Sequence, residues 1–235
     1  MPELSVPRRL NYSFAAYERL LRSLLEDGFS FTDFSALEDD EIVLRHDVDL
    51  SPQTALEMAR LEADLGVTST YCFLLTTPIY NLLEVEHVRA LNEISALGHE
   101  VALHFNTHHY WPSDPGVDEL TTMVRAECDA IGQLVDEEVD TVSFHRPPEW
   151  VLGVAFDGFE NTYQPAFFTE PVYRSDSNQK WRDEPPFPNY RPDRLQLLVH
   201  PGLWESQGRE MPEILEKIAL ERHGHVDSYL APLGT

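Results

Sequence analysis

The chain has 235 residues, of which 42% are hydrophobic, and its 41 acidic and 17 basic residues give a formal net charge of -24. A surface this negative repels phosphate backbones and anionic headgroups, which argues against binding to nucleic acid or insertion into a membrane. No stretch approaches the roughly 18 apolar residues of a membrane span, and the two cysteines make no disulfide framework. We therefore predict one globular domain over residues 1–235.

Lysine is almost absent, since Lys180 and Lys217 are the only two. An acidic surface with so few lysines favours a halophilic source, in which carboxylates keep the protein hydrated, over an ordinary solvated acidic face. The first residues, Met-Pro-Glu-Leu-Ser-Val-Pro-Arg-Arg, contain no apolar core of signal-peptide length. These features predict a cytoplasmic protein.

The predicted elements alternate between helices and short strands. Ser51 and Pro52 form an N-cap followed by proline at the first helical position, and Gly66 stops that helix. In chain order the pattern predicts a helix over 14–25, a strand over 42–44, a helix over 51–65, a strand over 68–75, a helix over 84–97, a strand over 100–105, a helix over 117–135 and a strand over 141–144. Such alternation is typical of a parallel sheet or barrel.

The pattern weakens after residue 146. A proline-rich loop covers residues 183–193, a late strand is predicted over 195–199, and a terminal helix over 212–222. His87, His223 and His225 fall on predicted helices or on the tail and are predicted to be surface residues. The fold class predicted from these elements is α/β, a distorted (β/α) barrel with fewer than eight regular units.

Side chains suited to catalysis follow the ends of four predicted strands. In parallel α/β folds functional groups collect where strands end at their carboxyl side. Asp47 and Asp49 are two residues apart, so in an extended chain both carboxylates face one site. The full set is Asp47, Asp49, His104, His108, Arg146 and His200.

One aspartate and two histidines form a ligand set that suits Zn²⁺ and also Fe²⁺, Co²⁺ or Ni²⁺. Three protein ligands leave positions open for water and substrate, as in catalytic sites. A metal that holds one of two neighbouring carboxylates leaves the other free as a base. We expect one divalent ion as cofactor, with zinc as the first choice.

Five short motifs occur in one order between residues 42 and 201. They are Arg45-His46-Asp47-Val48-Asp49, Gly98 to His104 continuing to His108, Phe144-His145-Arg146-Pro147-Pro148, Arg174-Ser175-Asp176-Ser177 with Trp181 after it, and Leu197-Leu198-Val199-His200-Pro201. In content and order they resemble the motifs of the polysaccharide deacetylase family (NodB-like, carbohydrate esterase 4). The resemblance covers most of the chain and implies the same barrel and a metal-dependent deacetylase.

The resemblance also implies roles for individual residues. It implies Asp47 as general base, His200 as general acid, Arg146 as the residue that orients Asp47, Asp176 as the residue that orients His200, Glu149 and Trp181 as substrate-binding residues, and Asp49, His104 and His108 as metal ligands. Two departures stand out. Val48 separates the aspartates, which are adjacent in most of the family, and Glu149 replaces a tyrosine whose backbone N–H helps to bind the oxyanion. Proline lacks an N–H, but Glu149 retains one.

The function implied is hydrolysis of an acyl group from an amide nitrogen, with an N-acetylated sugar in glycan metabolism as the expected substrate. A hydrolase of a non-sugar C–N bond, and a metal-binding protein of the same fold without catalysis, are the alternatives. Some residues keep a structural interpretation as well. His104 and His108 could be ordinary loop histidines, Arg146 could pair with an acidic neighbour, Asp176 could be a turn residue, and Trp181 could pack in the interior.

Overall fold

A single parallel sheet forms the centre of the molecule. The computed structural model describes residues 7–187, 190–205 and 207–233. Its strands are β1 (Ser30–Thr32), β2 (Glu41–Val48), β3 (Thr70–Phe73), β4 (Glu100–Phe105), β5 (Thr141–Phe144), β6 (Glu160–Asn161), β7 (Val172–Ser175) and β8 (Arg194–Val199). The order across the sheet is β6-β5-β4-β3-β2-β8-β7, with β1 beside the first half of β2, and every pairing is parallel.

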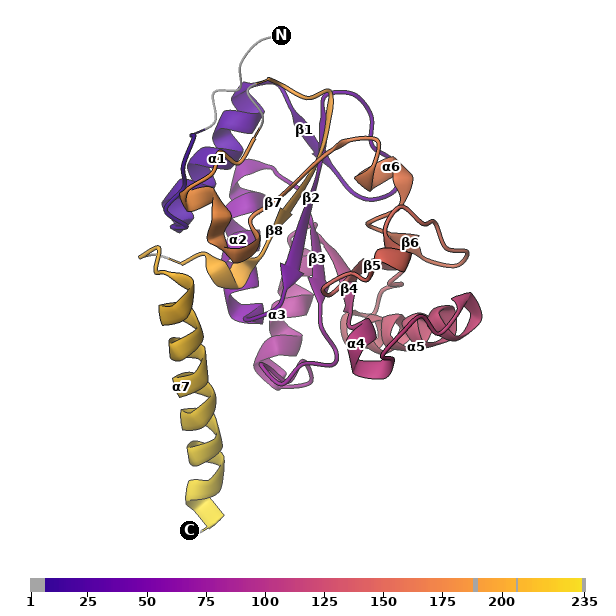
Figure 1. The fold of residues 1–235 in the computed structure, drawn as a ribbon. Helices are drawn as coiled ribbons and strands as arrows, with labels where there is room; N and C mark the ends of the chain where they lie inside the picture. The colour runs from indigo at the N-terminus through magenta and orange to yellow at the C-terminus, as the bar shows by residue number, and fades with distance from the viewer. Residues whose placement is uncertain (1–6, 188–189, 206, 234–235) are drawn as a thin grey trace.

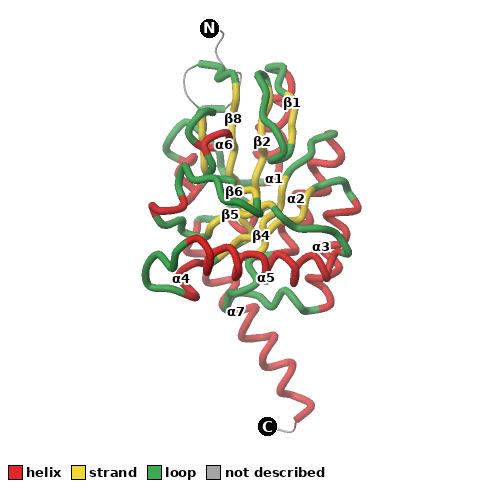
Figure 2. The backbone as a smooth tube through the Cα atoms, turned by 90° about the vertical axis from the view of Figure 1, so that its right-hand side faces the viewer, coloured by secondary structure: helices red, strands yellow, loops and turns green. Residues whose placement is uncertain are grey.

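The sheet curls into a half-barrel whose ends are β6 and β7 (Figures 1 and 2). The predicted distorted (β/α) barrel is confirmed. The helices are α1 (Phe14–Glu26), α2 (Pro52–Leu65), α3 (Val85–Ala96), α4 (Thr107–Tyr110), α5 (Val117–Val135), α6 (Pro165–Phe168) and α7 (Met211–Leu230), with short 3-10 helices η1 (Glu149–Val151), η2 (Ser177–Arg182), η3 (Pro201–Leu203) and η4 (Ala231–Leu233). In the described part of the chain, no helix is both long and apolar enough to cross a membrane.

Local signals in the sequence explain where the first helices begin. Ser13 and Ser51 accept hydrogen bonds from backbone N–H groups in the first turns of α1 and α2, at 3.1 Å in both cases. Such caps satisfy donors that a helix start leaves unpaired. Gly66 ends α2 in the left-handed conformation at φ 70°, which glycine adopts at little cost.

The prediction differs from the structure mainly in element length and in the late strands. The strand predicted over 42–44 extends to Val48, so Asp47 lies within β2. The terminal helix predicted over 212–222 continues to Leu230. The sequence pattern does not predict strands β1, β6 and β7, because runs of two to four residues carry no readable alternation.

Strand β2 runs through the middle of the sheet and is buried along seven of its eight residues. Alternate side chains of a strand point to opposite faces. Arg45 and Asp47 therefore face the hollow of the half-barrel, and His46 faces the helix layer, where it lies beside Glu62 of α2. Polar groups thus lie on both sides of one buried strand, and the carboxyl end of that strand carries the candidate site.

Candidate functional site

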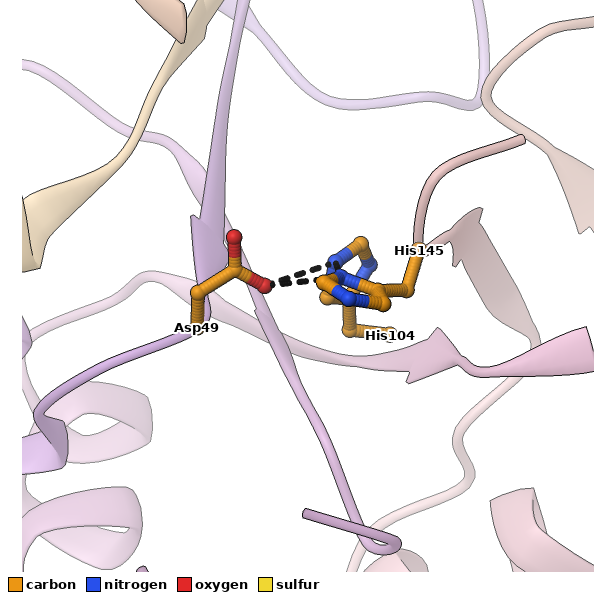
Figure 3. A group of neighbouring side chains, drawn as sticks. All are labelled: Asp49, His104 and His145. Carbon is orange, nitrogen blue, oxygen red and sulfur yellow. Dashed lines mark hydrogen bonds and ion pairs between the residues drawn. The ribbon is translucent and has the colours of Figure 1, made fainter. Parts of the chain in front are cut away.

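Asp49, His104 and His145 bring three potential ligand atoms to one point at the carboxyl edge of the sheet (Figure 3). Asp49 Oδ1 lies 3.2 Å from His104 Nε2 and 3.0 Å from His145 Nδ1. The two imidazole nitrogens are 3.2 Å apart. Each residue comes from the end of a different strand, namely β2, β4 and β5.

This triangle of atoms fits a divalent cation. Two ligands about 2.0–2.1 Å from a tetrahedral zinc ion lie roughly 3.3 Å from each other, close to the 3.0–3.2 Å observed. Asp49 Oδ1 is buried and has no hydrogen-bond partner among the described residues. A buried carboxylate oxygen that faces two imidazole nitrogens without a hydrogen bond has the environment of a metal ligand.

The carboxyl group of Asp49 is held in its charged form. Burial by itself would raise its pKa, but His104 and His145 beside it, with the charge of His200 nearby, bring the pKa well below the ordinary value. A deprotonated carboxylate is the form that binds a metal.

Asp47 forms a buried ion pair with Arg45, two residues earlier on the same face of β2. Arg45 Nε lies 3.2 Å from Asp47 Oδ1, and Nη2 lies 3.2 Å from Oδ2. Burial would raise the pKa of Asp47, but Arg45, His104 and His200 outweigh it and lower that pKa. Asp47 Oδ1 also lies 3.8 Å from His104 Nδ1 and has no hydrogen-bond partner in the described chain.

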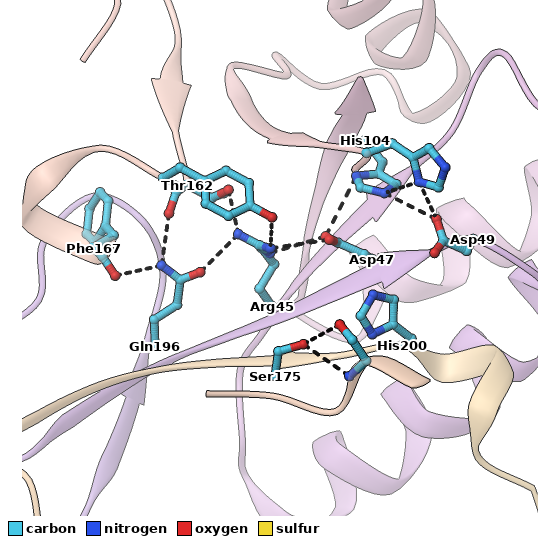
Figure 4. Close-up of polar contacts among 12 residues, drawn as sticks. Arg45, Asp47, Asp49, His104, Thr162, Phe167, Ser175, Gln196 and His200 are labelled. Atoms are coloured by element: carbon cyan, nitrogen blue, oxygen red, sulfur yellow. Dashed lines mark hydrogen bonds and ion pairs between the residues drawn. The ribbon is translucent and has the colours of Figure 1, made fainter. Parts of the chain in front are cut away.

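Arg45 is itself fixed by two residues that follow β6 at one end of the sheet and by one residue of the neighbouring strand β8 (Figure 4). Its Nη1 donates to Thr162 Oγ1 at 2.7 Å and to Gln196 Oε1 at 2.9 Å, and its Nη2 donates to the Tyr163 hydroxyl at 2.8 Å. The guanidinium also lies over the Tyr163 ring, 4.5 Å from its centroid. Gln196 is anchored in turn by two backbone carbonyls. This network of protein groups holds the Arg45 guanidinium against Asp47.

His200 follows β8 and is bound to Asp176. His200 Nδ1 lies 2.6 Å from Asp176 Oδ1, and the His200 backbone N–H donates to both carboxylate oxygens at 3.1 Å. Trp204 Nε1 donates to Asp176 Oδ2 at 2.7 Å. Because a carboxylate accepts only, Nδ1 carries a proton, and Nε2 remains as the nitrogen that can exchange a proton with another molecule.

The pKa of His200 is raised to about 9. Burial disfavours the imidazolium and lowers the pKa, but the Asp176 carboxylate, together with Asp49 and Asp47, outweighs the burial. His200 is therefore an imidazolium at neutral pH and can act as an acid.

The ends of β2 and β8 approach each other because Gly202 has no side chain. A Cβ atom at Gly202 would clash with the side chain of Leu50. Leu50 follows Asp49 directly, and Gly202 lies two residues after His200. The close contact between these two segments thus positions His200 next to the two aspartates.

The ligand set predicted from the sequence differs from the triangle at one residue. His108 lies outside the triangle on the short helix α4; its side chain is exposed, and its Nε2 lies 3.1 Å from the carbonyl oxygen of Arg146. His145 supplies the second imidazole instead. Strand β5 pairs with β4 so that Ser143 lies opposite His104, which places His145 just beyond the same edge. The signal for His145 in the sequence is its position directly after a predicted strand.

A second difference concerns the arginine beside Asp47. Arg146 is exposed, has φ 47°, and makes no ion pair within the described residues. The left-handed turn at Arg146 carries its side chain outward while His145 stays at the edge. Arg45 lies beside Asp47 where Arg146 was predicted, and the alternation of Arg45 and Asp47 in one strand is the signal that could have identified it.

The two predicted substrate-binding residues differ in their surroundings. Trp181 is 1% exposed and packs against Trp204 and Phe187 in the core, which agrees with the interior packing that the sequence left open as the alternative for this residue. Glu149 is exposed and begins η1 after two prolines. Its backbone N–H is not used within that helix, because the first residue of a helix has no intrahelical acceptor.

The fold and the site together define a (β/α) half-barrel with a candidate divalent metal centre, a buried carboxylate and an imidazole–carboxylate pair at the carboxyl edge of its strands. No family model matches the chain, and no curated protein sequence matches it. Solved structures of low sequence identity do.

One similar structure is a variant of the peptidoglycan deacetylase PdaC from Bacillus subtilis, with 14% identity and a TM-score of 0.46 over 87% of this chain and 100% of that one. Another is a family 4 acetyl xylan esterase from Clostridium thermocellum in complex with a cobalt ion, with 13% identity and a TM-score of 0.43 over 78% of this chain and 84% of that one. A third is the CE4 family pseudoenzyme BA3943 from Bacillus anthracis, with 13% identity and a TM-score of 0.44 over 77% of this chain and 60% of that one.

Proposed function

We propose that the protein is a metal-dependent hydrolase that removes an acyl group from an amide nitrogen, with an N-acetylated sugar as substrate. The observation that carries this proposal is the arrangement around Asp49, His104 and His145. These three possible metal ligands share the carboxyl edge of the sheet with the charged, fixed carboxylate of Asp47 and the charged imidazole of His200. Hydrolysis of an amide needs a base, an acid and an electrophile in one site.

Asp49, His104 and His145 would hold the metal, and we expect zinc, although the donor set also suits cobalt or iron. When bound, the metal supplies Lewis-acid polarisation of the acyl carbonyl and of water. The resemblance to the family supports Asp47 as the base that accepts a proton from the attacking water. Arg45 keeps that carboxylate charged and oriented, since both carboxylate oxygens lie 3.2 Å from guanidinium nitrogens.

His200 completes the reaction as the acid. Its Nδ1 is committed to Asp176 at 2.6 Å, so the proton on Nε2 is the one available to the leaving amine. The raised pKa, about 9, keeps that proton in place at neutral pH. Trp204 and the backbone N–H of His200 bond the same Asp176 carboxylate and prevent it from turning away.

The backbone N–H of Glu149 is the donor that we propose for the developing oxyanion. It follows Pro147 and Pro148, neither of which has an N–H. The exposed Glu149 side chain stands where the family has tyrosine and would favour a substrate with hydroxyl or amine donors. A cytoplasmic location, which we include in the proposal, favours a small nucleotide-linked or lipid-linked glycan precursor over a cell-wall polymer.

The alternatives differ in what they predict for the catalytic pair. An inactive binding protein has no use for a charged His200 bonded to a fully buried Asp176, so the intact pair favours catalysis. A hydrolase of a non-sugar C–N bond would use the same groups and differs only in substrate.

The test is release of acetate from a panel of N-acetyl sugars and of non-sugar acetamides, with protein stripped of metal and reloaded with zinc or cobalt. We expect metal-dependent acetate release from at least one sugar and none from Asp47→Asn. Activity on non-sugar amides alone would overturn the sugar assignment, and no hydrolysis with any metal would overturn the enzyme assignment.

A further inference from the structure

Helix α7 projects from the body of the molecule (Figures 1 and 2). Ile214, near its start, is the one residue of the helix that is fully buried. Leu215, Leu220, Val226 and Tyr229 are all more than 40% exposed. The distal half of α7 therefore lacks buried apolar side chains that would hold it against the body.

The polar contacts between the distal half of α7 and the body converge on Glu84, the N-cap residue of α3. Arg222 Nη1 and His225 Nε2 each lie 3.6 Å from Glu84 Oε1. These residues are separated from Glu84 by more than 130 positions in the chain. The contact therefore joins two distant segments through one carboxylate.

His87 lies on the other side of Glu84 and is buried, contrary to the surface position predicted for it. It is only 7% exposed. Its Nδ1 lies 2.7 Å from the carbonyl oxygen of Asn81. Because that oxygen can only accept, Nδ1 carries a proton, and the neutral ring presents the lone pair of Nε2.

Two carboxylates face the His87 ring without forming hydrogen bonds to it. Glu86 Oε1 lies 3.9 Å from Nε2, and Glu84 Oε2 lies 3.9 Å from Nδ1. Ligand atoms of Glu84, Glu86 and His87 all lie within 4.8 Å of one another. At this distance the lone pair of Nε2 and the carboxylate are not hydrogen-bonded to each other, and a cation placed between them would bind to both.

A histidine that binds metal typically donates its other ring N–H to a backbone carbonyl, which fixes the tautomer. His87 already has this arrangement through Asn81. Two imidazoles and two carboxylates form a donor set that suits Zn²⁺ and related borderline cations. The carboxylate of Glu86 is 63% exposed and can move a few tenths of an ångström toward His87 without disturbing the core.

We propose that Glu84, Glu86, His87 and His225 form a second divalent-cation site, separate from the triangle at the carboxyl edge, that fastens α7 to the start of α3. The site takes a borderline cation such as Zn²⁺. Arg222 stays beside Glu84 Oε1 and offsets the negative charge of the carboxylates that the cation does not neutralise. This inference does not depend on the deacylase proposal.

The experiment counts zinc in the full-length protein. Asp49→Ala combined with His104→Ala disables the first site, and the protein is then dialysed against free zinc and its metal content measured. We expect one zinc per chain in this double variant and two in the unaltered chain. Absence of zinc from the double variant would overturn the proposal.

His225→Gln in the double-variant background tests the ligand assignment, with His223→Gln as the matched control. His223 lies on the same helix, is 77% exposed, and pairs with Asp227 instead of Glu84. We expect His225→Gln to weaken zinc binding by roughly tenfold or more and His223→Gln to leave it unchanged. Equal effects of the two substitutions would contradict the site.

Attachment of α7 provides a second readout. Added zinc should slow hydrogen exchange of the α7 amides in the double variant and should have no such effect in the His225→Gln version. His87→Gln should behave like His225→Gln, and circular dichroism reports whether this buried position still folds. Slowing that persists in the His225→Gln protein would show that zinc acts elsewhere.

Discussion

Two buried polar clusters lie back to back on strand β2, and they differ in how completely their hydrogen bonds are made. The front cluster faces the hollow of the half-barrel and contains Arg45, Asp47, Asp49, His104, His145 and His200. The rear cluster faces α1 and α2 and contains Tyr17, His46, Glu62, Ser69, Tyr71 and His99.

Glu62 is the centre of the rear cluster, and both of its oxygens are fully used. Oε1 accepts from Tyr17 at 2.5 Å and lies 2.8 Å from His46 Nε2. Oε2 accepts from Ser69 at 2.6 Å and from Tyr71 at 2.8 Å. Burial would raise the pKa of Glu62, but His46 and these donors lower it.

The front cluster leaves several buried atoms without hydrogen bonds to the described residues. They are Arg45 Nε and Asp47 Oδ1, which still face each other at 3.2 Å as an ion pair, and Asp49 Oδ1 and His104 Nδ1; in the rear cluster only His46 Nδ1 lacks a hydrogen bond. An unsatisfied buried polar group costs about 1–3 kcal/mol. The front cluster therefore keeps binding capacity for a ligand, and the rear cluster is complete as a structural anchor.

The largest effect that we expect from substitutions in the front cluster is on turnover. Asp47→Asn should lower kcat by roughly 10²–10⁴-fold, the usual contribution of a positioned base, and leave metal content nearly intact. Asp49→Asn should lower metal affinity instead, because a neutral amide is a poorer ligand. Metal content after dialysis and deacylation rate with and without added zinc measure both. If excess zinc restored the activity of Asp47→Asn, Asp47 would be the metal ligand and Asp49 the base.

The rear cluster should respond in stability and not in chemistry. Glu62→Leu removes the acceptor of four donors, and loss of one partner of a buried charged pair costs about 3–5 kcal/mol. Urea denaturation of the metal-free protein measures the free energy of unfolding. Activity per folded molecule and metal content should stay unchanged, so a selective loss of activity without loss of stability would contradict the division between the clusters.

Zinc affinity tests whether His145 or His108 is the second imidazole ligand of the front cluster. His145→Ala should weaken zinc binding by more than the roughly 10–100-fold that loss of an outer hydrogen-bond partner costs. His108→Ala should stay within that range, because its Nε2 contacts only a backbone carbonyl. Zinc titration of each variant gives the dissociation constants, and the reverse order would restore the ligand set predicted from the sequence.

The dependence of kcat on pH tests whether His200 is the acid. Its pKa of about 9 means that the acid is protonated below that pH, so kcat should fall as the pH rises through about 9. Asp176→Asn removes the largest charge that raises this pKa, and the alkaline limb should move to lower pH. Measurement of kcat between pH 5 and 10 is the check. An alkaline limb that stays in place would show that His200 is not the acid.

Salt should have little effect on the interactions within either cluster, because buried charge pairs are little screened. It should instead reduce the repulsion between charges on the surface. With a net charge of -24, we expect the protein to lose structure in dilute buffer and to regain it in molar potassium chloride, where the Debye length is about 3 Å. Circular dichroism at increasing salt measures this. Full structure without salt would rule out the halophilic prediction and leave the site untouched.

The sequence by itself determined the alternation of strands and helices and the strand ends at which the chemistry lies. Alternation fixes a parallel sheet, and the carboxyl ends of parallel strands meet at one edge. For this reason the positions of Asp47, Asp49, His104 and His200 along the chain suffice to bring them to one edge of the sheet. This inference holds for any parallel sheet and does not depend on how the helices pack around it.

Only the tertiary structure decided which neighbours complete the site. His108 and His145 both follow strands, but the turn of α4 carries His108 outward and the β4–β5 register keeps His145 at the edge. The left-handed backbone at Arg146 likewise turns that residue to the surface. Sequence spacing states how far a residue lies from a strand end, whereas the direction of a loop side chain depends on backbone angles and on contacts with distant segments.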